Sequence, residues 1–168
     1  GIGTIKSDNP QLTVRHIETT RQPKKIVLDS QLSIPLGASL LQDESAIIFT
    51  ADHHNQAKIS QLTKLGVQVI PLPANDGTVD LEKMLTLLAT DFAMNEILVE
   101  AGSNLNGALL NANLVDEIIL YLAPHLLGDD AQGIFRLPEL VDLEQKKTLI
   151  FEDIRTVGQD IRIVARFR

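Results

Sequence analysis

The chain has 168 residues, of which 44% are apolar and 22% charged, and its net charge is −7, the balance of one folded globular domain. It contains no cysteine, which excludes a thiolate metal site, a disulfide framework and a cysteine nucleophile in these residues. No apolar run reaches the roughly 20 residues that cross a bilayer. The net charge is +2 over residues 1–30, +1 over 152–168 and −10 between them. We therefore expect no nucleic-acid partner and no membrane partner.

Short apolar runs alternate along the chain with segments of helical periodicity. The apolar runs predict strands at residues 25–29, 45–51, 67–72, 96–100, 117–123, 149–155 and 160–167. The periodic segments predict helices at residues 55–65, 81–92 and 105–114. Asp80 is the expected N-cap of the second helix, Gly158 the expected hairpin turn, and the polar residues 11–24 a loop. The alternation predicts one α/β domain, residues 1–168, whose mixed sheet is covered on both faces and ends in an antiparallel pair.

The turn between residues 100 and 108 is the leading candidate for a binding element. Gly102 and Gly107 flank small polar residues, and in such turns glycine lets a ligand approach the backbone while helix N–H groups face a phosphate. A tight strand-to-helix turn at Gly102 and close packing at Gly107 explain the two glycines equally well, and the spacing is not the G-x-G-x-x-G fingerprint. Glu100 ends the predicted strand, where ligands gather in open α/β sheets, although a solvated carboxylate is the commoner interpretation.

Three other features bear on a site. Asp8 precedes Asn9-Pro10 in a predicted turn, and Arg15 offers a guanidinium that can bind a phosphate, although an exposed arginine is commoner. Residues 126–133 form a loop rich in glycine and aspartate that could frame the mouth of a site. The four histidines lack metal-ligand spacing, so we expect no metal site.

Five segments, taken together, carry a family resemblance: GIGT…SDNPQLTVR, QPKKIVLDS, EILVEAGSNLNGALLNANLVDEIILYLAP, LLGDDAQG and FEDIRTVGQDIRIVARF. In this order and at these intervals they resemble the reductase domain of the bacterial bifunctional riboflavin-biosynthesis deaminase/reductase. The resemblance implies a dihydrofolate-reductase-like fold with three αβα layers and a mixed, mostly parallel sheet closed by an antiparallel C-terminal hairpin. It also implies a cytoplasmic homodimer. The family's opening strand and helix and its zinc-dependent deaminase domain are absent from these residues.

The resemblance implies NADPH-dependent reduction of 5-amino-6-(5-phosphoribosylamino)uracil to its ribitylamino product, by hydride transfer to the sugar C1′. It implies substrate contacts at Leu12, Arg15 and Glu100, with Arg15 on the ribose phosphate. No residue stands out as a general acid, so we assign no catalytic residue. The implied cofactor contacts are Thr4, Asp8, Ser30, Gly102, Ser103, Asn104, Leu105, Asn106, Gly107 and Ala108.

Two alternative functions stay open at this point. One is a pteridine or folate reductase on the same fold, because one fold hosts many chemistries. The other is a non-catalytic module that dimerises or holds a nucleotide, with residues 118–123 and the closing hairpin as pairing surfaces. Activity with dihydrofolate would favour the first, and pairing without NADPH binding would favour the second.

Overall fold

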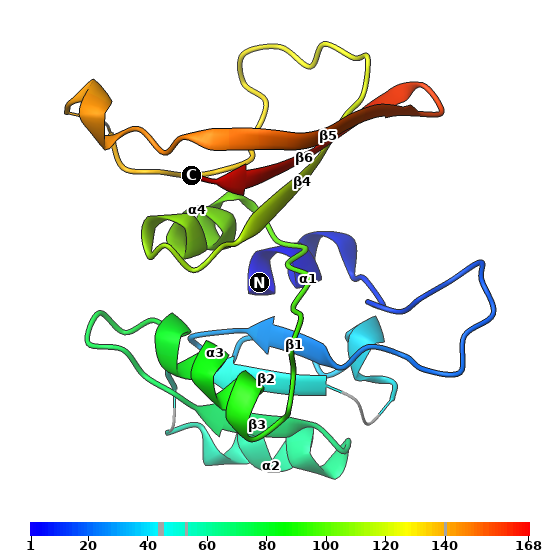
Figure 1. The fold of residues 1–168 in the computed structure, drawn as a ribbon. Coiled ribbons are helices and arrows are strands. Elements are labelled where there is room, and N and C mark those ends of the chain that lie inside the picture. The colour runs from blue at the N-terminus through cyan, green and yellow to red at the C-terminus, as the bar shows by residue number, and fades with distance from the viewer. Residues whose placement is uncertain (44–45, 53, 140) are drawn as a thin grey trace. The chain divides into compact units, whose positions relative to one another are not determined.

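The computed structural model, drawn in Figure 1, describes residues 1–43, 46–52, 54–139 and 141–168. The chain divides into two units, Gly1–Gly102 and Ser103–Arg168. The first unit contains a parallel sheet and the second an antiparallel sheet. None of the helices in the described ranges is both long and apolar enough to span a membrane.

The parallel sheet of the first unit has the order β1-β2-β3. Its strands are β1 (Lys25–Leu28), β2 (Ala46–Thr50) and β3 (Gln68–Pro71). Every residue of the central strand β2 is buried, as expected for a parallel strand covered on both faces. The three strands predicted here are therefore confirmed, although Ser45, the first residue of the second one, lies outside the described residues.

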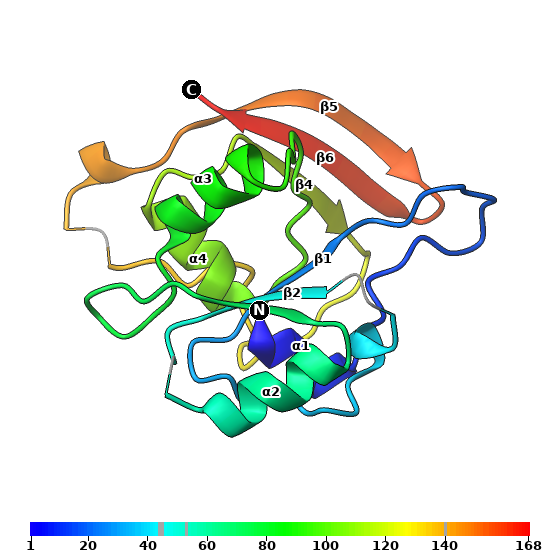
Figure 2. The same cartoon turned by 90° about the horizontal axis from the view of Figure 1, so that it is seen from below.

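Helices cover both faces of this sheet, and the side chains of β2 alternate between the two layers. Ile48 packs into one core with the helices α1 (Ile2–Asp8) and α2 (Gln56–Lys64). Ile47 and Phe49 pack into the other core with α3 (Leu81–Thr90). Figure 2 shows α1 and α2 on one side of the strands and α3 on the other. The first unit thus has the three αβα layers that the resemblance implied.

The ends of these helices follow from local sequence. The Asp80 carboxylate accepts a hydrogen bond from the Lys83 backbone N–H at 3.0 Å, which confirms the predicted N-cap of α3. Asn55 caps α2 in the same way through Lys58. Helix α1 was not predicted, because Gly3 and Thr4 at its start are weak helix formers. It is anchored by the buried Ile5 and ends at Asn9, whose φ is 44°.

The predicted strand at residues 96–100 is wrong. These residues form no ladder with any other described residue, and the side chain of Leu98 is 76% exposed. An apolar run of this length predicts a strand only if another strand takes up its backbone N–H and C=O groups. In the described chain that partner is missing, so the segment has no regular secondary structure.

The second unit consists of α4 (Ser103–Asn111), the short helix η2 (Leu143–Gln145) and an antiparallel sheet of order β4-β6-β5. The strands are β4 (Glu117–Leu122), β5 (Leu149–Val157) and β6 (Asp160–Phe167). The turn of the closing hairpin contains Gly158, whose φ is 63°. The α/β class with parallel strands followed by an antiparallel hairpin is confirmed, and the described ladders group the strands as two sheets of three.

Candidate functional site

A tight loop after β1 fixes the position of Ser30. The preceding Asp29 is fully buried, and its carboxylate accepts hydrogen bonds from the Ile34 N–H at 2.7 Å and the Ser33 hydroxyl at 3.1 Å. The Ser30 carbonyl accepts bonds from the backbone N–H groups of Ala51 and Asp52, at 3.1 and 2.9 Å. Ser30 is therefore held at the carboxyl ends of β1 and β2, the sheet edge where ligands of open α/β folds bind.

Two predicted cofactor residues of the first unit lie next to each other. A Cβ added to Gly102 would lie 4.0 Å from the Thr4 Oγ1, and no other atom would be closer. The space beside the Gly102 backbone is thus open on the side that a side chain would fill. Thr4 is half-buried in α1, and Asp8, at the end of the same helix, is exposed.

The segment that carries Leu12 and Arg15 has an unusual backbone conformation. Asn9, Leu12 and His16 have positive φ values of 44°, 51° and 66°, and non-glycine residues in this region cluster at functional sites. Leu12 packs against the core beneath α1, whereas the Arg15 side chain is exposed. Glu100 is also exposed.

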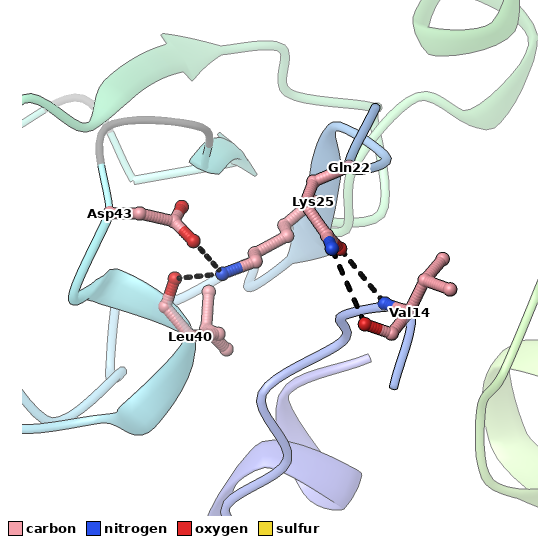
Figure 3. Close-up of polar contacts among 5 residues, drawn as sticks. All are labelled: Val14, Gln22, Lys25, Leu40 and Asp43. Atoms are coloured by element: carbon pink, nitrogen blue, oxygen red, sulfur yellow. Dashed lines mark hydrogen bonds and ion pairs between the residues drawn. The ribbon is translucent and has the colours of Figure 1, made fainter. Parts of the chain in front are cut away.

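A side-chain amide closes the loop that contains Arg15. Gln22 Oε1 accepts a hydrogen bond from the Val14 N–H at 2.9 Å, and its Nε2 donates to the Val14 carbonyl at 3.3 Å (Figure 3). Gln22 thus imitates a paired strand residue and fixes the backbone beside Arg15. Figure 3 also shows the buried Lys25, whose Nζ donates to the Leu40 carbonyl and pairs with Asp43. The sequence pattern did not predict either contact.

The remaining predicted cofactor residues form the first turns of α4. Residues 132–136, which we call the strap, lie against this turn. The Arg136 N–H donates to the Ser103 carbonyl at 2.9 Å, and the Gln132 amide donates to the Ser103 hydroxyl at 2.9 Å. Asn106 Nδ2 donates to the Ile134 carbonyl at 3.4 Å, and the Arg136 guanidinium lies 3.5 Å from Asn104 Oδ1.

Gly107 lies where the strap passes closest to the helix. A Cβ at this position would overlap the Arg136 carbonyl oxygen and lie 2.7 Å from its carbonyl carbon. Of the two explanations of this glycine, close packing is therefore the one that the geometry supports directly. Sequence reasoning treated residues 126–133 only as a possible frame of the site, and the strap contacts were missed. The one signal that could have found them is a glycine one turn inside a helix.

A separate hollow of about 490 Å³ lies in the second unit at the end of the antiparallel sheet. It contains none of the predicted site residues. Its lining includes three cationic side chains, Lys146, Lys147 and Arg168, beside the apolar Leu110 and Phe167. Among the described residues, no three histidine, aspartate or glutamate side chains gather into a metal site.

Residues 1–163 match the family described as the RibD C-terminal domain. The chain belongs to this family. RibD of Escherichia coli K12, a riboflavin biosynthesis protein, is 35% identical over 94% of this chain and 45% of that protein. The 5-amino-6-(5-phosphoribosylamino)uracil reductase of Buchnera aphidicola subsp. Acyrthosiphon pisum is 28% identical over 96% of this chain and 81% of that protein. The resemblance stated from the sequence is thereby confirmed.

A solved structure of Acinetobacter baumannii RibD has the same fold, with a TM-score of 0.87 and 29% identity. The match covers 100% of this chain and 46% of that one. The chain thus spans less than half the length of the RibD proteins that it matches. Family membership assigns no role to individual residues, so the binding roles of the residues described above stay predictions.

Proposed function

We propose that this RibD-type domain reduces the ribosyl group of 5-amino-6-(5-phosphoribosylamino)uracil to the ribitylamino product, with NADPH as reductant. The proposal rests on how much of two different relatives this chain matches. The chain matches less than half of RibD, but it matches 81% of a relative that is named as this reductase alone. Residues 1–168 therefore correspond to the reductase part of RibD, and we propose that they act as one reductase domain.

The proposed cofactor contacts have suitable surroundings. Ser30 is fixed at the carboxyl edge of the parallel sheet, and the space beside Gly102 is open apart from Thr4. The first turn of α4 carries the polar side chains Ser103, Asn104 and Asn106, and a helix start presents N–H groups and the positive end of its dipole to phosphates. NADPH, when bound, supplies the hydride. Asp8 and residues 102–108 complete the proposed contacts.

The proposed substrate contacts are Leu12, Arg15 and Glu100. Arg15 is exposed on a loop that Gln22 closes, so its guanidinium can bind the substrate phosphate in a bidentate manner. Leu12, whose φ is positive, lies three residues before Arg15 and packs against the core. These residues bind and orient the substrate, and orientation supplies much of the rate gain in hydride transfer.

A homodimer is also part of the proposal. Phe151, Ile154 and Leu122 belong to one face of the antiparallel sheet by their pairing register, and their exposed fractions are 63%, 57% and 54%. Apolar side chains gathered on one sheet face are typical of an interface.

Sedimentation of Phe151→Ser should show a monomer, whereas Ile119→Ser, on the opposite face of β4, should leave a dimer. Wild-type protein that sediments as a monomer would contradict this part. The cytoplasmic location stays a prediction.

The test of the reductase proposal is turnover. Purified protein is mixed with NADPH and the phosphoribosylamino pyrimidine, and both cofactor oxidation and the ribitylamino product are measured. We expect product with NADPH and much less with NADH. Reduction of dihydrofolate without reduction of the pyrimidine would instead favour the folate reductase. Binding of NADPH without turnover of either substrate would favour a nucleotide-holding module.

A further inference from the structure

The strap makes contact with every polar side chain in the first turn of α4. Gln132 donates to the Ser103 hydroxyl, and the Arg136 guanidinium reaches the Asn104 carbonyl oxygen. The Asn106 amide donates to the Ile134 carbonyl. A fourth contact joins backbone to backbone, from the Arg136 N–H to the Ser103 carbonyl. The start of α4 is therefore held from outside the helix by one short segment.

Gly107 is what permits these contacts. The Arg136 backbone occupies the space that a Cβ would need: its nitrogen would lie 3.0 Å and its carbonyl carbon 2.7 Å from that atom. Gly107 is buried although it belongs to the helix, and glycine inside a helix costs about 1 kcal/mol relative to alanine. The close approach of the strap explains why a glycine occupies this helix position in spite of that cost.

A helix start needs such support if it is to bind a phosphate. The first N–H groups of a helix have no partner within the helix, and helix ends fray. A ligand that must order a frayed turn loses affinity, whereas a turn that is ordered beforehand binds more tightly. The Gln132 contact also occupies a lone pair of the Ser103 oxygen and leaves the hydroxyl hydrogen free to be donated.

We infer that the strap is a positioning element of the cofactor site: Gln132, through Ser103, and Arg136, whose backbone lies against Gly107, order residues 103–106 before the cofactor binds. The inference rests on the proposed NADPH site. It concerns residues outside the predicted cofactor contacts, since Gln132, Ile134 and Arg136 act on the cofactor only through α4. Their loss should weaken NADPH binding and leave the binding of the pyrimidine unchanged.

Two variants test the strap, each with a matched control. Gln132→Ala removes the amide that holds Ser103, and Gln145→Ala removes an exposed amide of η2 in the same unit. Gly107→Ala forces the strap away from α4, whereas a Cβ at Gly37 meets nothing within 4 Å, so Gly37→Ala is the control for the added methyl group. Amide hydrogen exchange of residues 103–106 is measured without cofactor, and the Kd of NADPH is measured by titration.

We expect Gln132→Ala to speed exchange at residues 103–106 and to raise the Kd of NADPH by about tenfold, the usual effect of one lost hydrogen bond of this kind. Gly107→Ala should also speed exchange at residues 103–106, because its Cβ displaces the strap, and both controls should match the wild type. Faster exchange with an unchanged Kd would overturn the positioning role, and so would unchanged exchange in both variants. A wild-type chain that fails to bind NADPH would contradict the proposed function, and exchange would still show whether the strap orders the helix start.

Discussion

The two units of this domain are stabilised in different ways. Sixteen of the twenty buried apolar side chains among the described residues belong to Gly1–Gly102, and only Leu109, Leu110, Val164 and Ala165 belong to Ser103–Arg168. The first unit is a parallel sheet packed on both faces by two buried apolar clusters. The second unit holds its helix start with a few hydrogen bonds from the strap. Substitutions should therefore affect stability in the first unit and local order in the second.

Removal of core volume in the first unit should have the largest effect. Phe49 is fully buried in the centre of β2, and Phe49→Ala should lower the free energy of unfolding by about 3–5 kcal/mol. Ile150→Ala, in the second unit at a side chain that is 52% exposed, should cost less than about 1 kcal/mol. Urea denaturation of both variants measures the contrast, and equal losses would contradict the difference between the units.

The next largest effect should come from Asp29. Its buried carboxylate accepts two hydrogen bonds that shape the Ser30 loop, so Asp29→Ala should cost about 2–3 kcal/mol, because it leaves the Ile34 N–H buried and unpaired. It should also weaken NADPH binding through Ser30. Calorimetric melting with and without NADPH measures both effects. A variant that binds NADPH as the wild type does would remove Ser30 from the proposed site.

Substitution of Arg15 should change binding without changing stability. Because its side chain is exposed, Arg15→Ala should leave the melting temperature unchanged and raise the KM for the pyrimidine by about tenfold. The KM for NADPH should stay as it is. Steady-state kinetics with each substrate varied in turn makes the distinction, and an unchanged KM for the pyrimidine would exclude Arg15 from the substrate site.

The smallest effect concerns the cap of α3. Hydrogen bonds from the Lys83 backbone and side chain lower the pKa of Asp80 from its ordinary value of 3.8. A carboxyl whose pKa is lower in the folded state stabilises the fold above that ordinary value and loses its contribution as the pH falls through the lowered pKa. The Asp80→Ala variant should therefore have a slightly lower melting temperature than the wild type at neutral pH. This difference in melting temperature should become smaller in acid. A difference in melting temperature that does not change with pH would contradict a stabilising role of the ionised Asp80 carboxylate.

Features that depend on neighbouring residues could be predicted from the sequence. The strands β1 to β3, the Asp80 cap and the hairpin at Gly158 follow from apolar periodicity and turn chemistry. The resemblance named Ser30 and residues 102–108 as site candidates, and their binding roles stay predictions. These predictions needed only local patterns or ordered motifs.

Contacts between distant residues could not be predicted in this way. The apolar run at residues 96–100 reads as a strand, but pairing depends on a partner elsewhere in the chain, and the described ladders include none for it. The same holds for the Gln22 amide that closes the Arg15 loop and for the strap over Gly107. A glycine in a helix signals that something comes close, but its identity depends on the tertiary fold.

The most direct test of the central claim is a titration of the purified chain with NADPH and, separately, with NADH, followed by thermal melting. Binding to the folded state raises the melting temperature in proportion to the logarithm of ligand concentration over Kd. We expect clear stabilisation by NADPH and little by NADH, and we expect the NADPH effect to be smaller in Gln132→Ala and unchanged in Gln145→Ala. A melting temperature that neither nucleotide changes would contradict the cofactor site and the reductase function proposed for this domain.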